Sequence, residues 1–182
     1  MVTQKQATRT ALDNLVQEIR DEVRTGGEVQ AIADRVADRL RPFLTRDDLL
    51  TEEQMESDPN QYKQHVLHVE PDGSFSIVSL CWLPGQETPI HDHVSWCVVG
   101  VQQGLEFETT YELKSDDRGH EWLVETGQVT CMPGQTEALT PPGDIHKVRN
   151  GGDDLAISIH VYGADIGKLG SSILRRYEQE VR

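Results

Sequence analysis

The stretch Pro-Ile-His-Asp-His-Val-Ser-Trp-Cys at residues 89–97 carries the strongest signal in the chain. Its two histidines, His91 and His93, are separated by one residue, so on a β-strand both imidazoles project from the same face. Two imidazoles on one face can bind a single metal ion. The stretch therefore predicts a strand that carries a chelating histidine pair.

Short alternating segments surround this pair from Tyr62 onward and predict a mainly β domain. In residues 105–111, apolar side chains alternate with Glu106 and Glu108, which is the period-two pattern of a strand with one buried face. Many short strands joined by Gly and Pro turns indicate a sandwich or barrel. The other predicted strands are residues 75–83, 98–102, 122–125, 136–139 and 155–162.

Residues 10–50 have helical periodicity instead. Their apolar residues recur at intervals of three and four on both sides of Gly26-Gly27, which predicts an amphipathic helical hairpin. A capping-box spacing at Thr51 predicts a short third helix. We therefore expect a single domain, with residues 1–58 as a helical segment packed on a barrel of residues 59–182.

Composition excludes several classes of function. The 182 residues hold 31 Asp and Glu against 17 Lys and Arg, and the net charge of -14 would repel a phosphate backbone, so we expect no nucleic-acid partner. We expect no membrane span and a cytoplasmic location, because the chain has neither a long apolar run nor a leader pattern at its start. Three widely spaced cysteines favour reduced thiols over a disulfide framework.

Two blocks of the sequence resemble the paired motifs of the cupin superfamily. They read Gly85-x5-His91-x-His93-x3-Cys97-x6-Gly104 and Pro141-x-Gly143-x2-His146-x3-Asn150. The resemblance implies a cupin double-stranded β-helix, or jelly-roll barrel, in which His91, His93 and His146 hold a metal ion. Cys97 stands where a typical cupin has a glutamate ligand, so the site would consist of three neutral histidines.

A second group of polar residues lies near the end of the β region. In residues 156–162, Ser158, His160 and Tyr162 alternate with apolar residues, so a strand sends all three to one face. Buried polar groups must be hydrogen-bonded. If this face lines the barrel interior, Ser158 and His160 would form a relay that orients the Tyr162 phenol toward the metal.

These motifs together resemble the cysteine dioxygenase family of bacterial thiol dioxygenases, over residues 62–166. The resemblance implies one Fe(II) per chain, held by the three histidines, and insertion of both atoms of O2 into a thiol to give a sulfinate. It also implies that Ser158, His160 and Tyr162 are the catalytic outer-sphere triad. Cys97 matches a cysteine that forms a thioether crosslink with the matching tyrosine in some members.

Substrate choice in this family depends on the residue two positions after a tyrosine that resembles Tyr62, which here is Gln64. Cysteine-specific members have arginine there, whereas members acting on 3-mercaptopropionate have glutamine. The chain is thus of the Gln type and should bind free cysteine poorly, because an amide cannot replace a bidentate guanidinium. Gln-type members also carry an arginine shortly after the triad tyrosine, where this chain has Gly170-Ser171, with Arg175 and Arg176 nearest.

Several alternatives stay open from the sequence. The metal could be zinc with Cys97 as a fourth ligand, although closed zinc sites usually contain more cysteines. The chain could be a metal cupin dioxygenase or isomerase acting on a non-thiol substrate, or a non-catalytic metal- or small-molecule-binding cupin. It could act as a monomer or a homodimer. The remaining histidines His65, His68 and His120 are expected to be structural or surface residues.

Overall fold

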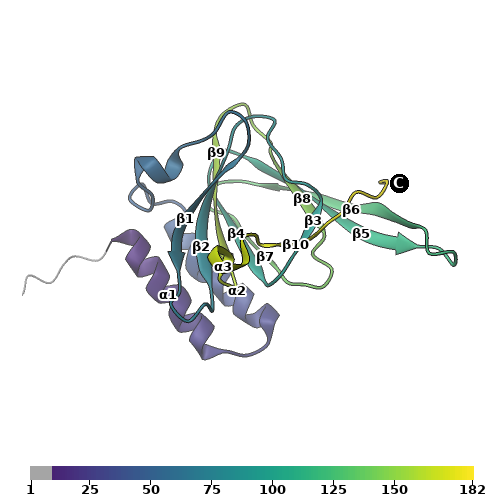
Figure 1. Cartoon of the computed structure of the whole chain (residues 1–182). Helices are drawn as coiled ribbons and strands as arrows, with labels where there is room; N and C mark the ends of the chain where they lie inside the picture. The colour runs from purple at the N-terminus through teal and green to yellow at the C-terminus, as the bar shows by residue number, and fades with distance from the viewer. Residues whose placement is uncertain (1–9) are drawn as a thin grey trace, which may run out of the picture.

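The computed structural model describes residues 10–182, so residues 1–9 of the predicted helical segment lie outside the described residues. Within the described chain, ten strands form two five-stranded antiparallel sheets with the order β1-β2-β9-β4-β7 and β10-β3-β8-β5-β6. Two helices cover the outer side of the first sheet (Figure 1). The predicted cupin fold with N-terminal helices is confirmed.

All six strands predicted from alternation are present, as is the predicted strand of the histidine pair, and three further strands join them. The strands are β1 Lys63–Val69, β2 Ser76–Trp82, β3 His91–His93, β4 Cys97–Gln103, β5 Glu106–Ser115, β6 Glu121–Cys131, β7 Thr136–Leu139, β8 His146–Asn150, β9 Ala156–Tyr162 and β10 Ile173–Arg176. Strand β6 is longer than predicted because it pairs with β5 along its whole length. The resulting hairpin projects beyond the barrel (Figure 1).

The predicted helical hairpin consists of α1 (Ala11–Thr25) and α2 (Val29–Leu40), with a left-handed Gly26 after α1. The prediction of helix up to residue 50 was wrong, since α2 gives way to a 3-10 turn over Arg41–Phe43. Pro42 explains this, because it has no N–H to donate to the carbonyl four residues back and its ring crowds that carbonyl. The third helix is a 3-10 turn over Glu52–Met55, with its capping box formed.

The helices and the first sheet share one apolar core. Leu15, Ile19 and Leu40 are fully buried against outward-facing residues of the sheet such as Ile159. Gly100 of β4 permits this close approach, because a Cβ there would lie 2.8 Å from Leu40 Cδ2. The first sheet is therefore buried on both faces, which holds the strands of the barrel interior rigidly in place.

The predicted strand with one buried face buries its acidic residues. The carboxylates of Glu106 and Glu108 on β5 point into the barrel and are only 1% and 3% exposed, whereas Phe107 lies outside under Arg149. Alternation fixes which residues share a face, but it does not say which face is buried. At Glu108 the interior needs an acidic group, as the metal site shows below.

The C-terminal segment completes the barrel near the histidines. A one-turn helix, α3 (Ile166–Leu169), leads to β10, which pairs with β3. Asp92 of β3 anchors this strand, since it accepts a hydrogen bond from the Tyr177 hydroxyl at 2.8 Å.

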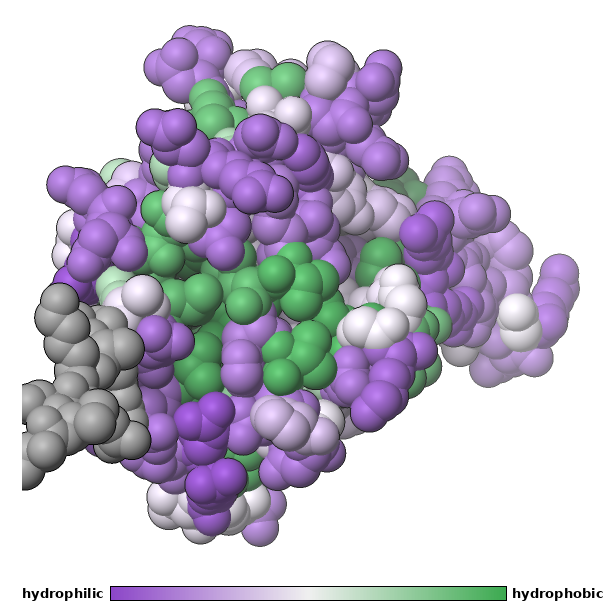
Figure 2. All heavy atoms as spheres, turned by 60° about the vertical axis from the view of Figure 1, so that its left-hand side comes forward, coloured by the Kyte–Doolittle hydropathy of each residue, from purple (hydrophilic) through white to green (hydrophobic). Residues whose placement is uncertain are grey.

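The face that carries α1 and β1 has an apolar patch surrounded by hydrophilic side chains (Figure 2). Val66 of β1 is 54% exposed, and Leu12, Val16 and Leu67 line a groove beside α1. Among residues 10–182, no helix has the length and apolar character needed to cross a membrane.

Candidate metal centre

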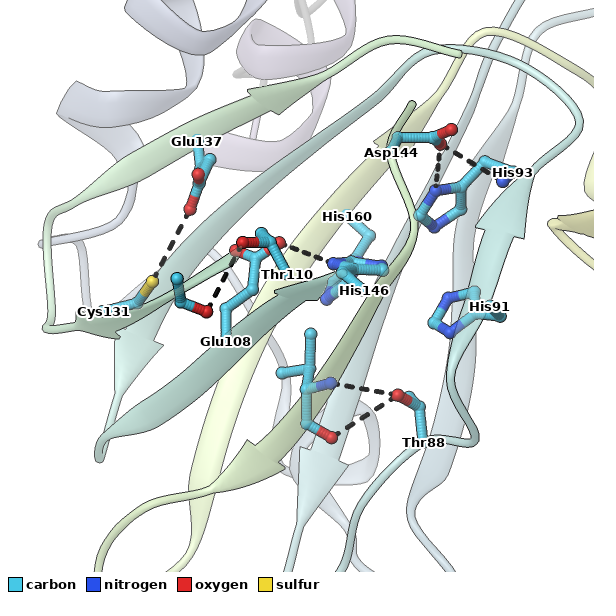
Figure 3. A network of polar contacts seen from close by, with 12 residues as sticks. Thr88, His91, His93, Glu108, Thr110, Cys131, Glu137, Asp144, His146 and His160 are labelled. Carbon is cyan, nitrogen blue, oxygen red and sulfur yellow. Dashed lines mark hydrogen bonds and ion pairs between the residues drawn. The ribbon is translucent and has the colours of Figure 1, made fainter. Parts of the chain in front are cut away.

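Three histidines from two neighbouring strands of the second sheet converge inside the barrel. His91 and His93 lie on β3, and His146 of β8 is the direct register partner of His91. Their ring centroids are 4.6 to 4.9 Å apart and their ligand atoms all lie within 4.8 Å of one another. Figure 3 shows the three rings facing a common point. The predicted triad is therefore brought together.

Each of these imidazoles is held by a hydrogen bond at its Nδ1 atom. His91 Nδ1–H donates to the Pro89 carbonyl at 2.9 Å, and His93 Nδ1–H donates to Asp144 Oδ2 at 2.9 Å. His146 Nδ1–H donates to Glu108 Oε1 at 2.6 Å. A proton on Nδ1 leaves the lone pair on Nε2 free to bind a metal.

The donor set fits a divalent cation such as Fe(II). Burial and the neighbouring histidines lower the pKa of His91 to about 3, and burial, followed by His93, lowers the pKa of His146 to about 3, so both rings are neutral at physiological pH. His146 Nε2 is also buried without a hydrogen-bond partner among the described residues. An unpartnered buried nitrogen beside two further imidazoles is suited to bind a metal ion.

Two acidic residues that hold the histidine ligands, Glu108 and Asp144, were not predicted as site residues from the sequence. Burial raises the pKa of Glu108, and an interaction with Glu137 opposes that rise. Burial and the Glu108 carboxyl raise the pKa of Glu137 to about 8, so Glu137 is protonated at neutral pH and supports the charge of Glu108. Burial disfavours the charge of Asp144, but its contact with His93 holds the Asp144 pKa below its usual value.

The predicted relay is formed on β9. Ser158 Oγ lies 2.9 Å from His160 Nε2, and His160 Nδ1 lies 3.2 Å from the Tyr162 hydroxyl. Trp82 Nε1–H donates to Ser158 Oγ at 3.2 Å. Burial raises the pKa of Tyr162 well above its usual value, which keeps the phenol protonated. The Tyr162 ring centroid is 6.1 Å from that of His93, so the relay ends beside the metal ligands.

Cys97 lies beside the tyrosine and outside the histidine cluster. It is fully buried, is the register partner of Tyr162 across β4 and β9, and interacts with the Tyr162 hydroxyl. Burial raises the pKa of the Cys97 thiol. The geometry thus provides no support for Cys97 as a fourth zinc ligand and places its sulfur against the phenol.

A small cavity of about 40 Å³ opens onto the metal centre. Tyr62 and Gln64 are among its walls, and the Tyr62 ring packs on Trp82 with centroids 4.6 Å apart. Its other walls are Leu80, Trp82, Thr88, Val148, Ser172, Ile173, the three histidines, His160 and Tyr162.

Neither Arg175 nor Arg176 lines this cavity. Arg175 is exposed and donates to Glu121 at 3.0 Å, and Arg176 is exposed at the position opposite His91. No cationic side chain belongs to the walls that the described residues form.

Residues 3–172 match the sequence profile of the family named Cysteine dioxygenase type I. The chain belongs to this family. The buried three-histidine cluster fits the metal site of the cysteine dioxygenase family, and the cupin barrel is its scaffold.

Characterised members of the family align with part of this cysteine dioxygenase homologue. The cysteine dioxygenase type 1 of Danio rerio is 28% identical over 107 residues, which is 58% of this chain and 52% of the relative. The human protein of the same name is 27% identical over 122 residues, 60% of each chain. The chain thus spans between about half and three fifths of these curated relatives. A solved cupin superfamily protein from Desulfitobacterium hafniense aligns with 66% of the chain and 94% of its own length, at 14% identity and a TM-score of 0.47.

The other histidines of this family member take the structural and surface positions that were predicted. His65 Nε2 lies 2.8 Å from the Glu56 carbonyl, and His68 Nε2 lies 2.9 Å from Glu70. His120 stacks on Trp122 in the projecting hairpin. None of the three belongs to a group of potential metal ligands among the described residues.

Proposed function

We propose that this chain is a non-haem Fe(II) dioxygenase that converts a small thiol and O2 into a sulfinate. The observation that carries the proposal is the position of the Ser158–His160–Tyr162 relay beside three buried histidines whose Nδ1 atoms are all held by hydrogen bonds. A site that only stores a metal or a small molecule needs no oriented phenol. Membership of the cysteine dioxygenase family supports the same reaction.

The protein would contribute position and hydrogen bonds. Fe(II) bound by His91, His93 and His146 would supply the redox chemistry that joins oxygen to sulfur. The cavity is small, which favours a short thiol as the substrate. The Tyr162 hydroxyl can donate a hydrogen bond to the bound reactants, and His160 and Ser158 orient it.

Gln64 and Tyr62 are the residues we assign to substrate choice. Both line the cavity, and Gln64 offers an uncharged amide in place of a guanidinium. The resemblance to Gln-type members favours 3-mercaptopropionate or a related thiol over cysteine, because cysteine-specific members bind the carboxylate with an arginine that this position lacks. The exposed positions of Arg175 and Arg176 leave Gln64, Tyr62 and the hydroxyls of the cavity to bind the rest of the substrate.

The contact between Cys97 and Tyr162 suits a thioether between Cys97 Sγ and the tyrosine ring. Forming this bond removes one hydrogen from the thiol and one from the ring, with O2 as the oxidant. Intact-mass measurement of protein turned over with thiol would then show a loss of two hydrogens that Cys97→Ser lacks. We further propose that the protein acts in the cytoplasm as a monomer or homodimer, with no nucleic acid or membrane partner.

A comparison of thiols tests the substrate assignment. Steady-state O2 uptake would be measured with 3-mercaptopropionate, cysteine, cysteamine and mercaptosuccinate for the wild type and for Gln64→Arg. We expect the wild type to prefer a thiol other than cysteine, and Gln64→Arg to raise kcat/KM for cysteine by roughly tenfold, the effect of one charge-assisted hydrogen bond. Efficient turnover of cysteine alone by the wild type would contradict the Gln-type assignment.

A further inference from the structure

A buried carboxyl group lies at the inner end of the relay. Glu106 on β5 is 1% exposed, and its carboxyl interacts with the Ser158 hydroxyl and the Trp82 indole. Its Oε1 atom is buried and has no hydrogen-bond partner among the described residues. A buried carboxyl next to a hydroxyl can act either as an acceptor or, when protonated, as a donor.

We propose that Glu106 is a positioning residue that sets the direction of the hydrogen-bond chain through Ser158 and His160, and thereby decides whether the Tyr162 hydroxyl donates into the metal cavity. The effect of Glu106 on turnover rests on the proposed function. The direction of the chain itself depends only on the donors and acceptors described above.

With Glu106 ionised, the chain runs toward the carboxylate. The Ser158 hydroxyl donates to Glu106, and its oxygen accepts from Trp82 and from His160 Nε2–H. His160 Nδ1 then has no proton and accepts from the Tyr162 hydroxyl at 3.2 Å. The single proton of the phenol is used within the chain, so Tyr162 presents only an acceptor to the cavity.

With Glu106 protonated, each hydrogen bond between Glu106 and Tyr162 reverses its direction. The Glu106 O–H donates to Ser158, and the Ser158 hydroxyl donates to His160 Nε2. The proton of His160 is then on Nδ1, and Nδ1–H donates to the Tyr162 oxygen. The Tyr162 O–H is then no longer used by His160 and can donate into the cavity, which is the arrangement the proposed reaction uses.

The surroundings favour a change of protonation at Glu106 without one at His160. Burial raises the pKa of Glu106 to about 7, and burial lowers the pKa of His160 to about 3, so the imidazole stays neutral while the carboxyl titrates. The groups that face Glu106 are Glu108 on its own strand, Cys131 on β6, Trp82 on β2, Asn150 on β8 and Ser158 on β9. His160 is connected to Glu106 through Ser158, and Glu137 of β7 lies beyond Glu108 and Cys131.

Nitrogen NMR of the histidines tests the inference directly, because the two neutral tautomers of His160 correspond to the two directions. The sample is the Zn(II)-loaded full chain with 15N-labelled histidine, and the His160 signal is the one absent from His160→Gln. From about pH 5 to about pH 9, on either side of the expected titration, the wild type should change from mainly Nδ1–H to mainly Nε2–H.

Variants of Glu106 provide the comparison. Glu106→Leu leaves His160 Nε2 as the only acceptor for the Ser158 hydroxyl, so His160 should remain Nδ1–H at every pH. Glu106→Gln should also give a tautomer ratio that does not change with pH, and it keeps the inference testable if the leucine variant does not fold. Glu112→Gln, which changes an exposed carboxylate on the same strand, should titrate like the wild type.

A wild-type tautomer ratio that is constant over this range, or a change with pH in Glu106→Leu equal to that of the wild type, would overturn the inference. Thiol-dependent O2 uptake by the Fe(II)-loaded chain is measured separately. A tautomer change without thiol oxidation would refute the proposed function and leave the role of Glu106 intact. Thiol oxidation with a fixed tautomer would refute the role of Glu106 alone.

Discussion

Replacing Glu108 by leucine should weaken metal binding although Glu108 touches no metal. Glu108 Oε1 accepts the Nδ1–H of His146 at 2.6 Å, and both side chains are at most 4% exposed. Without the carboxylate, the buried Nδ1–H has no acceptor, and the ring can move its proton to Nε2, where it blocks the ligand lone pair. Losing such a partner of a metal-bound histidine typically costs 10- to 100-fold in affinity, or about 1.4 to 2.7 kcal/mol.

The assay is competition between the protein and a chromophoric chelator for Zn(II), with anaerobic Fe(II) as a second metal. Glu108→Gln keeps an acceptor for His146 Nδ1–H, so its loss of affinity should be less than that of Glu108→Leu. Glu112→Leu, at an exposed position on the same strand, is the matched control and should bind like the wild type. A folded Glu108→Leu protein with wild-type affinity would refute the assignment of His146 Nε2 as a ligand held by Glu108.

Three further predictions follow from single contacts. Tyr162→Phe should retain the metal but lower kcat by roughly 10²-fold or more, measured as O2 uptake beside metal content, since it removes a proton donor. Glu70→Gln should lower the free energy of unfolding by about 2 kcal/mol at neutral pH. Arg20 holds the pKa of Glu70 below its usual value, so this difference in urea denaturation should vanish as the pH falls through that lowered pKa. Gly100→Ala should cost about 1 to 3 kcal/mol in the same assay, because its Cβ would collide with Leu40.

Much of the fold could be predicted because its pattern is local. The period of two marks β9, and the capping-box spacing at Thr51 marks where a helical turn begins. The short strand β10 could not be predicted, because it forms only by pairing with β3, which is distant in the sequence. The inward direction of Glu106 was also hidden, since acidic residues on a buried face violate the usual pattern.

The site residues also divide into those that a local pattern predicts and those that depend on contacts between distant parts of the chain. His91 and His93 are close in sequence, and their spacing alone predicts a shared face. Glu108 and Asp144 support ligands that lie 38 and 51 residues away in the chain, so no local pattern connects them. If the Glu106 and Glu108 face of β5 is taken as the buried face, Glu108 becomes a candidate site residue, because a buried carboxylate needs a hydrogen-bond partner.

The most direct measurement is anaerobic loading of the full chain with Fe(II), followed by exposure to 18O2 with each thiol and mass spectrometry of the product. The account predicts uptake of O2 that depends on the thiol, and a sulfinate that carries two 18O atoms. The same experiment with His146→Ala should show loss of both iron and product. Iron bound at the wild-type site with no oxidation of any thiol would contradict the central claim and indicate a cupin that acts on another substrate or only binds its metal.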